Sequence, residues 1–386
     1  MIPLFEPNLD LKEKKNLINC INSNWISSKG SFVQKFEKKI QSLTKSNYVV
    51  ACQSGSTALF LSLKIIGANY KTEVIVPSIT YISPVNAIIH NNSFPIFMDC
   101  DENNNLDINK VLLFLKEKTF FKYGKTFNKK TKRQIIAIVI PHLLGSAVNF
   151  HNLKKIFKKN NIFIIEDAAE AFGVFLKSKN NSINHVGTNG DIGCLSFNAN
   201  KLVTAAGGGA ILTSSKKIAK KFYYLINQAK DNEEFFIHNE PGYNLGLSNV
   251  HAAIGLAQTK KLKLFLKKKR KIFNNYKSLL KKTKNFELIN PENKVKSNFW
   301  LTVVKSRKKI NLRKLVKFMK SHKIQTRMLW YPNHLQKHMR NYERFSLNQS
   351  IKNYQSHLCL PSSVNLNRDK INKICNTLSK FEKKFT

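Results

Sequence analysis

The sequence predicts an α/β protein, in which helices cover a mainly parallel β-sheet. Short β-branched runs alternate with longer helical segments from about residue 49 to residue 212. Several of these runs are apolar on both faces, which is typical of strands buried within a parallel sheet. After Gly242 the pattern changes to a long helix followed by mixed strands and helices. We therefore expect a large α/β/α domain over residues 1–259 and a smaller α+β domain over residues 260–386.

Seven strands are expected in the first region from their β-branched and aromatic composition. They are YVVACQ (48–53), EVIVPS (73–78), FPIFMDCD (94–101), QIIAIVIPHL (134–143), NIFIIEDAA (161–169), GCLSF (193–197) and GAILTS (209–214). Helices are expected over Ser56–Ile66, Tyr81–Asn91 and Asn152–Lys159, and a solvated surface loop over Lys118–Lys132. From 250 to 282 apolar residues recur among lysines with helical period, so one long helix is expected to bridge the two domains.

The basic excess of the chain is large but consists mostly of lysine. There are 65 Lys and Arg against 23 Asp and Glu, a net charge of +42, and only eight of the 65 are arginine. Specific nucleic-acid readers favour arginine, because its planar fork forms paired hydrogen bonds with phosphate and guanine. We therefore expect no nucleic-acid partner. With 42% hydrophobic residues the chain has ample material for a core, so it is not disordered.

The cysteines and the apolar segments indicate the cellular compartment in which the chain is expected. The six cysteines are spread along the chain without a CxxC pair, which argues against a zinc cluster or a disulfide framework and suits a reducing cytoplasm. No metal site is predicted. The N-terminal residues show no signal-peptide pattern, and apolar runs such as 134–144 are too short to cross a bilayer. The chain is expected to be cytoplasmic, with no membrane partner.

Ligands of open α/β sheets gather at the carboxyl ends of strands, and two such ends carry small or aromatic residues. CQSGSTAL (52–59) leads from a strand into hydroxylated residues that open a helix. Free N–H groups and the helix dipole there form a phosphate site, although Ser56 and Thr57 could equally be N-cap residues. In VPSITY (76–81), Tyr81 could stack on a flat ligand or pack in the core.

Two further strand ends carry charged residues. In IIEDAAEA (164–171) a carboxylate follows an apolar strand, which is costly without a cation or donor. Asp167 therefore needs a buried arginine or the protonated ring nitrogen of a cofactor, unless it caps a helix. GDIGCLSFNANK (190–201) ends in Lys201 among small and apolar residues, where a desolvated, neutral amine can form a Schiff base. The glycine run 207–209 permits close backbone approach, which fits a cofactor pocket.

In chain order these features are a phosphate turn, an aromatic, an aspartate and a lysine thirty-four residues later. This order resembles the fold-type-I pyridoxal-phosphate (PLP) aminotransferases. More narrowly, the chain resembles the DegT/DnrJ/StrS-type sugar aminotransferases over nearly its whole length. The resemblance is carried by NWISSKG (24–30), SGSTAL (54–59), VPSITYISPVNAI (76–88), IEDAAEAFG (165–173), GDIGCLSFNANK (190–201), GYNLGLSNVHAAIGLAQ (242–258), QTR (325–327) and HLCLPSS (357–363).

The resemblance implies a role for each matching residue. Lys201 would form the Schiff base with PLP and then move the proton during amine transfer. Asp167 would keep the pyridine nitrogen protonated, Tyr81 would stack on the ring, and Glu170 would lie near its phenolic oxygen. The residues implied to hold the phosphate are Gly55, Ser56, Thr57 and Ser196, together with Asn244 reaching across from the partner in a homodimer with shared active sites.

The implied reaction moves an amino group from glutamate to C4 of a nucleotide-linked 4-keto-6-deoxy(-N-acetyl)hexose, for surface polysaccharide, lipopolysaccharide or glycan biosynthesis. SFNANK (196–201), the glycine run 207–209, NQAK (227–230) and SNFW (297–300) resemble the branch on routes to legionaminic acid and bacillosamine. GDP-perosamine synthases share WISS (25–28) and EDAAEA (166–171) and are the nearest alternative. A family variant with His in place of the Schiff-base lysine is a dehydratase, which Lys201 disfavours.

Two points stay open at the level of sequence. The arginine common in the N-x-R motif of the family is here Gly246, which leaves open how the carboxylate of the amino donor is bound. Arg327 and His334 are candidates for substrate contact. The hypothesis from another class is a PLP-binding regulatory protein with little catalysis.

Overall fold

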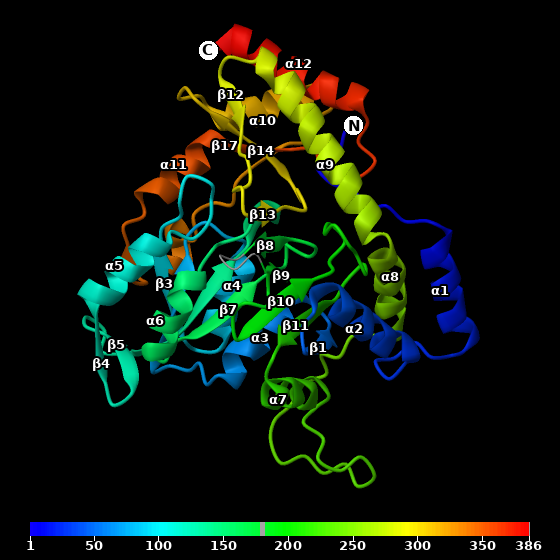
Figure 1. Ribbon diagram of the computed structural model, residues 1–386, viewed down its shortest axis with the longest axis vertical. Coiled ribbons are helices and arrows are strands. Elements are labelled where there is room, and N and C mark those ends of the chain that lie inside the picture. Colours follow the sequence, from blue (N-terminus) through cyan, green and yellow to red (C-terminus); the bar gives the residue numbers. More distant parts are fainter. Residues whose placement is uncertain (178–181, 386) are drawn as a thin grey trace.

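The centre of the molecule is a ten-stranded, mainly parallel sheet (Figure 1). The computed structural model describes residues 1–177 and 182–385. Across the sheet the order is β1 (Tyr48–Cys52), β11 (Gly209–Thr213), β10 (Ile192–Ser196), β7 (Phe163–Asp167), β6 (Gln134–Pro141), β2 (Thr72–Pro77), β3 (Phe94–Met98) and β16 (Arg344–Phe345). Neighbours from β10 to β16 pair in parallel, and β11 is antiparallel to both of its neighbours. All seven predicted strands are confirmed.

Helices cover both faces of this sheet, as the α/β/α prediction requires. One face carries α3 (Gly55–Ile65), α4 (Ile82–His90) and α7 (Lys216–Ile226), and the other carries α2 (Ser31–Thr44), α5 (Ile108–Lys118), α6 (Lys154–Lys159) and α8 (Asn249–Lys260). Alternate strand residues point to opposite faces. Thus Val76 of β2 packs in a cluster with Leu59 and Phe222, whereas its neighbour Ile75 packs with Phe114.

The lysine-rich stretch 118–132 is a β-hairpin, so the prediction of an irregular loop is wrong. Strands β4 (Thr119–Lys122) and β5 (Lys125–Asn128) pair in antiparallel register beside β6. Tyr123 and Gly124 both have positive φ, which closes a tight two-residue turn. Phe120 stacks on Phe127 across the strands, with ring centroids 5.5 Å apart. Because lysines dominate this stretch, the short alternation of polar and apolar residues that is typical of strands does not stand out in the sequence.

The long helix predicted over 250–282 is observed as two helices. α8 ends and α9 (Leu262–Leu279) begins at Lys261, which caps both. The buried Lys261 ammonium lies 2.6 Å from a Glu13 oxygen and 3.1 Å from an Asp10 oxygen. Both acids belong to the N-terminal cap of α1 (Leu11–Asn22). The two helices therefore meet at Lys261, whose side chain is bound by residues some 250 positions earlier in the sequence. The local spacing of apolar residues gives no information about such distant partners.

The C-terminal region contains a second sheet with its own core. The antiparallel strands are β12 (Phe286–Leu288), β14 (Thr302–Ser306), β17 (His357–Leu360) and β15 (Arg327–Met328), and α9, α10 (Leu312–Ser321) and α12 (Arg368–Phe385) pack on them. Figure 1 shows α9 (yellow) running from α8 up to this region beside α12 (red). Ile2 bridges to Ile324 and shares this core. A boundary between residues 259 and 260 stays a prediction.

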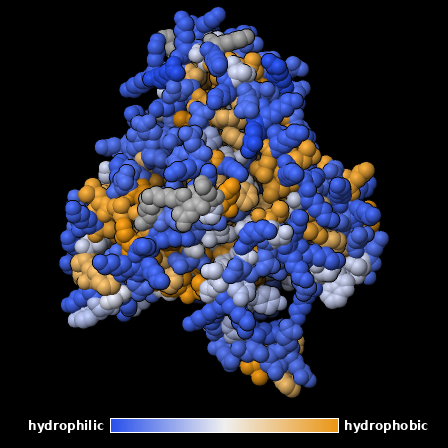
Figure 2. All heavy atoms as spheres, viewed as in Figure 1, coloured by the Kyte–Doolittle hydropathy of each residue, from blue (hydrophilic) through white to orange (hydrophobic). Residues whose placement is uncertain are grey.

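The remaining elements are short or peripheral. A three-stranded sheet is formed by β13 (Val295–Lys296), β8 (Phe175–Lys177) and β9 (Ile183–His185), and α11 (Asn348–Ser356) precedes β17. Within the described ranges, no helix combines the length and the apolar character needed to cross a membrane. Figure 2 shows that hydrophilic side chains dominate the visible face, and all six cysteines are buried free thiols.

Candidate active site

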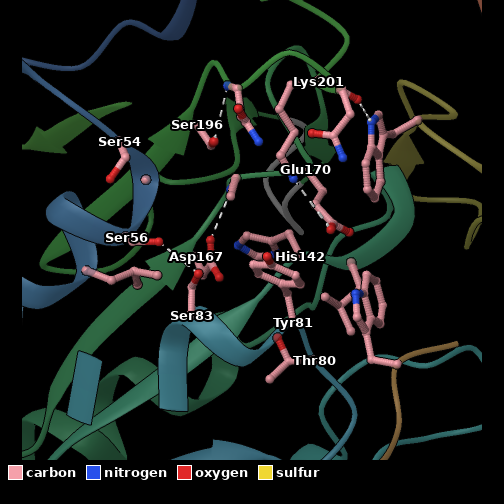
Figure 3. A pocket seen from close by; sticks show the side chains of 18 of the residues that line it. Ser54, Ser56, Thr80, Tyr81, Ser83, His142, Asp167, Glu170, Ser196 and Lys201 are labelled. Atoms are coloured by element: carbon pink, nitrogen blue, oxygen red, sulfur yellow. Dashed lines mark hydrogen bonds and ion pairs between the residues drawn. The ribbon is translucent and has the colours of Figure 1, made fainter. Parts of the chain in front are cut away.

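A pocket of about 350 Å³ lies at the carboxyl ends of β2, β6, β7 and β10, facing the N-terminus of α3 (Figure 3). In a parallel sheet these ends meet at one edge, which is why motifs far apart in sequence converge here. Side chains from the C-terminal region close the pocket. The lining residues are Ser54, Gly55, Ser56, Leu59, Thr80, Tyr81, Ser83, His142, Leu143, Asp167, Ala169, Glu170, Ser196, Asn198, Asn200, Lys201, Trp300, Arg327 and Trp330.

The N-terminus of α3 presents backbone N–H groups to one end of the pocket. Its N-cap is Ser54, whose Oγ accepts a hydrogen bond from Thr57 N at 3.0 Å, so the sequence interpretation of Ser56 or Thr57 as the cap is wrong. A Cβ on Gly55 would lie 2.8 Å from Cβ of Ser196, so only glycine lets the helix start this close to β10. The helix terminus and the Ser196 hydroxyl thus lie together, an arrangement suited to a phosphate group.

Lys201 lies in the loop after β10 and points into the pocket (Figure 3). Its Nζ is 3.6 Å from Oε1 of Glu170 and 4.4 Å from the centre of the Trp300 ring. The Lys201 side chain is 15% exposed. Trp300 is held in turn, because its Nε1 donates to the carbonyl of Asn200 at 2.8 Å. The amine is therefore positioned between an acid and an aromatic face.

The two acids of the pocket differ in their partners. Among the described residues, the Asp167 carboxylate accepts one hydrogen bond, from Ala169 N at 3.1 Å, and it caps no helix. Burial raises the pKa of Asp167, and the charge of Lys201 offsets only part of that increase. Glu170 accepts a bond from Leu144 N at 2.8 Å, and burial also raises its pKa against the effect of Lys201. Asp167 forms no ion pair among the described residues, so a cationic partner from a ligand would stabilise it.

His142 lies beside these acids in a defined tautomer. Its Nδ1 accepts from Val148 N at 3.1 Å, which leaves Nε2 to donate to Glu166 at 2.8 Å. Glu166 is fully buried, and burial alone would raise its pKa. Hydrogen bonds from His142 and from the backbone of Gly187 and Gly190 lower the pKa below its ordinary value. This ionised acid therefore orients the imidazole that forms part of the pocket wall.

Most of the predicted site residues meet in this pocket. Gly55, Ser56, Tyr81, Asp167, Glu170, Ser196, Lys201 and Arg327 all line it. Thr57 and Asn244 do not, and the exposed Asn244 lies in a segment that bridges to Asn227. His334 does not line the pocket either: it is buried and hydrogen-bonded to Ser78 at 2.5 Å. The glycine run 207–209 packs under the Ser54–Gly55 turn instead of lining the pocket.

Several lining residues were not predicted as site residues. His142 lies at the end of the predicted strand 134–143, so the rule that finds Asp167 could have found it. Trp300 and Trp330 reach the pocket from the C-terminal region. Nothing in their sequence spacing relates them to Lys201, because the packing of that region on the central sheet brings them there.

The groups that line the pocket match the functional groups of PLP. Lys201 matches an aldehyde, and the helix N-terminus matches a phosphate. The buried Asp167 carboxylate, which has no ion-pair partner within the described part of the chain, matches a protonated ring nitrogen. Tyr81 is 55% exposed at the start of α4, where its ring is free to cover a flat ligand.

Comparison with known proteins supports this chemistry. The model of the DegT/DnrJ/EryC1/StrS aminotransferase family matches residues 7–379. GDP-perosamine synthase of Escherichia coli O157:H7 is 32% identical, with 98% of each chain covered, and that of Vibrio cholerae is 30% identical, with 99% of each covered. Helicobacter pylori PseC, an aminotransferase involved in the biosynthesis of pseudoaminic acid, shares the fold, with a TM-score of 0.87 at 22% identity over 100% of both chains.

The family match and the fold agree with the pocket, and they favour an enzyme over a non-catalytic regulatory protein. The predicted cofactor and fold type are confirmed. This chain belongs to the DegT/DnrJ/EryC1/StrS aminotransferase family and is a PLP-dependent sugar aminotransferase of fold type I.

Proposed function

We propose that this enzyme transfers an amino group from glutamate to C4 of a nucleotide-linked 4-keto-6-deoxyhexose. The observation that carries the proposal is the pocket in which Lys201 lies 3.6 Å from Glu170 beside the buried Asp167. PLP, when bound, supplies an electron sink that allows an amino group to move between carbon atoms. The same lysine would serve both the donor and the acceptor half of the reaction.

In this proposal the chain's own residues hold the cofactor at three points. Nζ of Lys201 is the covalent attachment point. Asp167 holds a proton on the pyridine nitrogen, and its burial without an ion-pair partner among the described residues supports that role. N–H groups of Gly55 and Ser56, with the Ser196 hydroxyl, bind the phosphate at the start of α3.

Proton transfer is assigned to Lys201 with Glu170 beside it. The released amine takes a proton from the donor α-carbon and returns one at the sugar carbon that is aminated. Glu170 accepts the N–H of Leu144 and lies 3.6 Å from Nζ, so its carboxylate is placed to stabilise the protonated amine. The Trp300 ring covers the amine on another side and limits access of water.

A homodimer with shared active sites is part of the proposal. Asn244 is exposed and lies outside its own pocket, as a residue that serves the neighbouring subunit would. Trp25 and Ile26 are each 57% exposed, and burial of such side chains by a second copy would be favourable.

Two classes of nucleotide sugar are candidates for the acceptor substrate. The names of the relatives at 32% and 30% identity favour a GDP-linked sugar that yields perosamine. The segments SFNANK (196–201) and SNFW (297–300) favour an N-acetylated hexosamine nucleotide, and Trp300 of the second segment lines the pocket.

Absorbance of the two half-reactions tests the proposed function. Glutamate should convert the PLP form of the enzyme to the pyridoxamine form. Each nucleotide 4-keto sugar is then added to that form, and the true acceptor restores the PLP spectrum. Restoration by the GDP-linked 4-keto-6-deoxyhexose alone selects the perosamine class, and restoration by the N-acetylated nucleotide alone selects the other. No spectral change with glutamate would contradict the proposed donor.

A further inference from the structure

The β4–β5 hairpin exposes two aromatic side chains to solvent. Figure 1 shows the hairpin (cyan) projecting below α5 at the periphery of the molecule, and Phe121 and Tyr123 are 55% and 84% exposed. No other large hydrophobic side chain within the described part of the chain is as exposed as Tyr123. Its ring joins an apolar body to a polar hydroxyl, a combination suited to the boundary between water and an apolar phase.

The hairpin is fixed on the body of the protein, so these side chains are presented at a defined place. Thr126 is buried, and its Oγ1 donates to the carbonyl of Asn160, at the end of α6, at 2.7 Å. Nδ2 of Asn161 donates to the carbonyl of Gly124 in the turn at 3.1 Å. Inside the hairpin, the aromatic stack across the two strands adds to these contacts. A tip held in this way loses little conformational entropy when it contacts a partner.

Lysine is concentrated around the hairpin beyond its frequency in the whole chain. Seven of the seventeen residues from Lys116 to Lys132 are lysine, compared with 57 of the 386 residues overall. All seven are exposed, and Glu117 is the one acid in this stretch. Of these lysines, only Lys130 forms an ion pair within the described ranges, with Glu343 at 2.9 Å. The hairpin therefore combines a surplus of positive charge with exposed aromatic rings.

We infer that the β4–β5 hairpin docks the protein on the surface of an anionic membrane. Tyrosine is favoured at the headgroup level of a bilayer, and insertion of Tyr123 and Phe121 there removes their rings from water. The lysines around them are attracted by anionic headgroups, and several such charges act together. The sequence prediction of no membrane partner rested on the absence of a spanning segment, which docking of this kind does not need.

Nucleic acid is the competing polyanion for this surface. Its specific recognition relies on the planar fork of arginine, and no arginine lies between Lys116 and Lys132. Arg133, which follows, is already bound by groups of the protein. Its guanidinium carbon is 3.7 Å from the centre of the Phe94 ring, and its Nη1 is 3.7 Å from a Glu73 oxygen. Lysine acts as a point charge and suits a surface whose charges are mobile. The charge pattern therefore favours a lipid surface.

Flotation of the PLP-loaded protein with lipid vesicles tests this inference. Vesicles of phosphatidylcholine mixed with phosphatidylglycerol should bind the wild type, and vesicles of phosphatidylcholine alone should bind it far more weakly. The double variant Lys122→Gln/Lys125→Gln should bind the anionic vesicles about 25-fold more weakly, because each lysine near the surface contributes about fivefold. As a matched control, Lys271→Gln/Lys277→Gln removes two exposed charges from α9. This control should change the affinity less than about twofold, since distant charges are screened.

Substitution of the aromatic tip separates insertion of the rings from attraction between charges. Tyr123→Ser should weaken binding about tenfold and leave a remainder that high salt abolishes. Leu264→Ser, at a 50% exposed position of α9, should have no effect. Thermal denaturation and the visible PLP band should match the wild type in all four variants, because none of the substituted residues lines the pocket.

Absence of wild-type binding to the anionic vesicles, or equal binding to both kinds of vesicle, would overturn the inference. An equal loss of binding in the hairpin and α9 variants would also do so, because the charge of the whole protein would then suffice. Tighter binding of single-stranded DNA than of anionic vesicles at the same salt concentration would assign the hairpin to nucleic acid instead. Vesicle flotation requires no amine transfer, so its outcome is independent of the proposed function.

Discussion

Lys201 and Lys269 are both removed from solvent and both contact Trp300, yet their surroundings differ. Nζ of Lys201 faces the Trp300 ring, the Glu170 carboxylate and a pocket of about 350 Å³. Lys269 of α9 is 1% exposed, and its Nζ donates to the carbonyls of Trp300, at 2.8 Å, and of Ser362. Lys269 forms no ion pair among the described residues, and burial lowers its pKa well below the ordinary value.

The comparison separates a reactive position from a structural one. The Lys269 amine already donates to two backbone carbonyls, so its surroundings need no ligand. Lys201 instead has an acid at 3.6 Å and open volume beside it. Burial alone therefore does not identify a Schiff-base lysine. An adjacent proton acceptor and space for a cofactor do.

The largest expected effect is that of Lys201→Ala. Amine transfer should fall by about 10⁴-fold or more, because covalent attachment and proton transfer are lost together. The visible absorbance of lysine-linked PLP should also disappear, as measured by spectrophotometry of the protein mixed with PLP. Lys38→Ala, at an exposed position, should behave like the wild type. Substantial transfer by Lys201→Ala would refute the contrast between Lys201 and Lys269.

Lys269→Met should act on stability while sparing the chemistry. The substitution leaves the carbonyls of Trp300 and Ser362 without their donor, which costs about 1–3 kcal/mol in the free energy of unfolding. Urea denaturation measures this cost, and the visible PLP band should persist. If the band were lost while the stability stayed unchanged, Lys269 would belong to the reactive site.

The pH dependence of the same variant gives a smaller, graded effect. Unfolded lysine titrates near pH 10.4, whereas Lys269 in the folded state titrates well below its ordinary pKa. Between these two values the unfolded chain binds one proton more, so this residue makes stability rise with pH by up to about 1.4 kcal/mol per unit. Urea denaturation from pH 7 to 10 should show the stability difference between wild type and Lys269→Met growing with pH. A constant difference would mean that Lys269 is charged in the folded state.

The smallest effect concerns lysines on the surface. Lys29 pairs with Glu233 at 3.1 Å, but the two side chains are 64% and 74% exposed. Lys29→Ala should change the free energy of unfolding by less than about 1 kcal/mol, because water and salt screen such a pair. Thermal denaturation at low and high salt provides the measurement. A larger loss would show that the surface lysines contribute more to stability than their exposure suggests.

Much of the pocket could be predicted from sequence because a parallel sheet brings strand ends together. The ends of β1, β2, β7 and β10 carry the motifs of Gly55, Tyr81, Asp167 and Lys201, and each strand was recognisable from its apolar run. The cost of burying a charge and the dipole at a helix N-terminus indicate what these residues can bind. The resemblance to aminotransferases then related the four motifs to one another.

The rest depends on contacts between distant segments. Trp300, Trp330 and the orientation of Arg327 follow from how the C-terminal sheet packs on the central one. The break at Lys261 depends on Asp10 and Glu13, which lie about 250 residues earlier. In the sequence, Lys269 resembles the other lysines of α9, and only its burial in the structure distinguishes it from them. Local periodicity carries no information about such partners.

The most direct test asks which of the 57 lysines carries the cofactor. Borohydride fixes the bond between PLP and its lysine, and peptide mapping by mass spectrometry then locates the pyridoxyl group. We expect stoichiometric labelling of Lys201, with none at Lys269. Labelling of Lys269, or of surface lysines in place of Lys201, would contradict it.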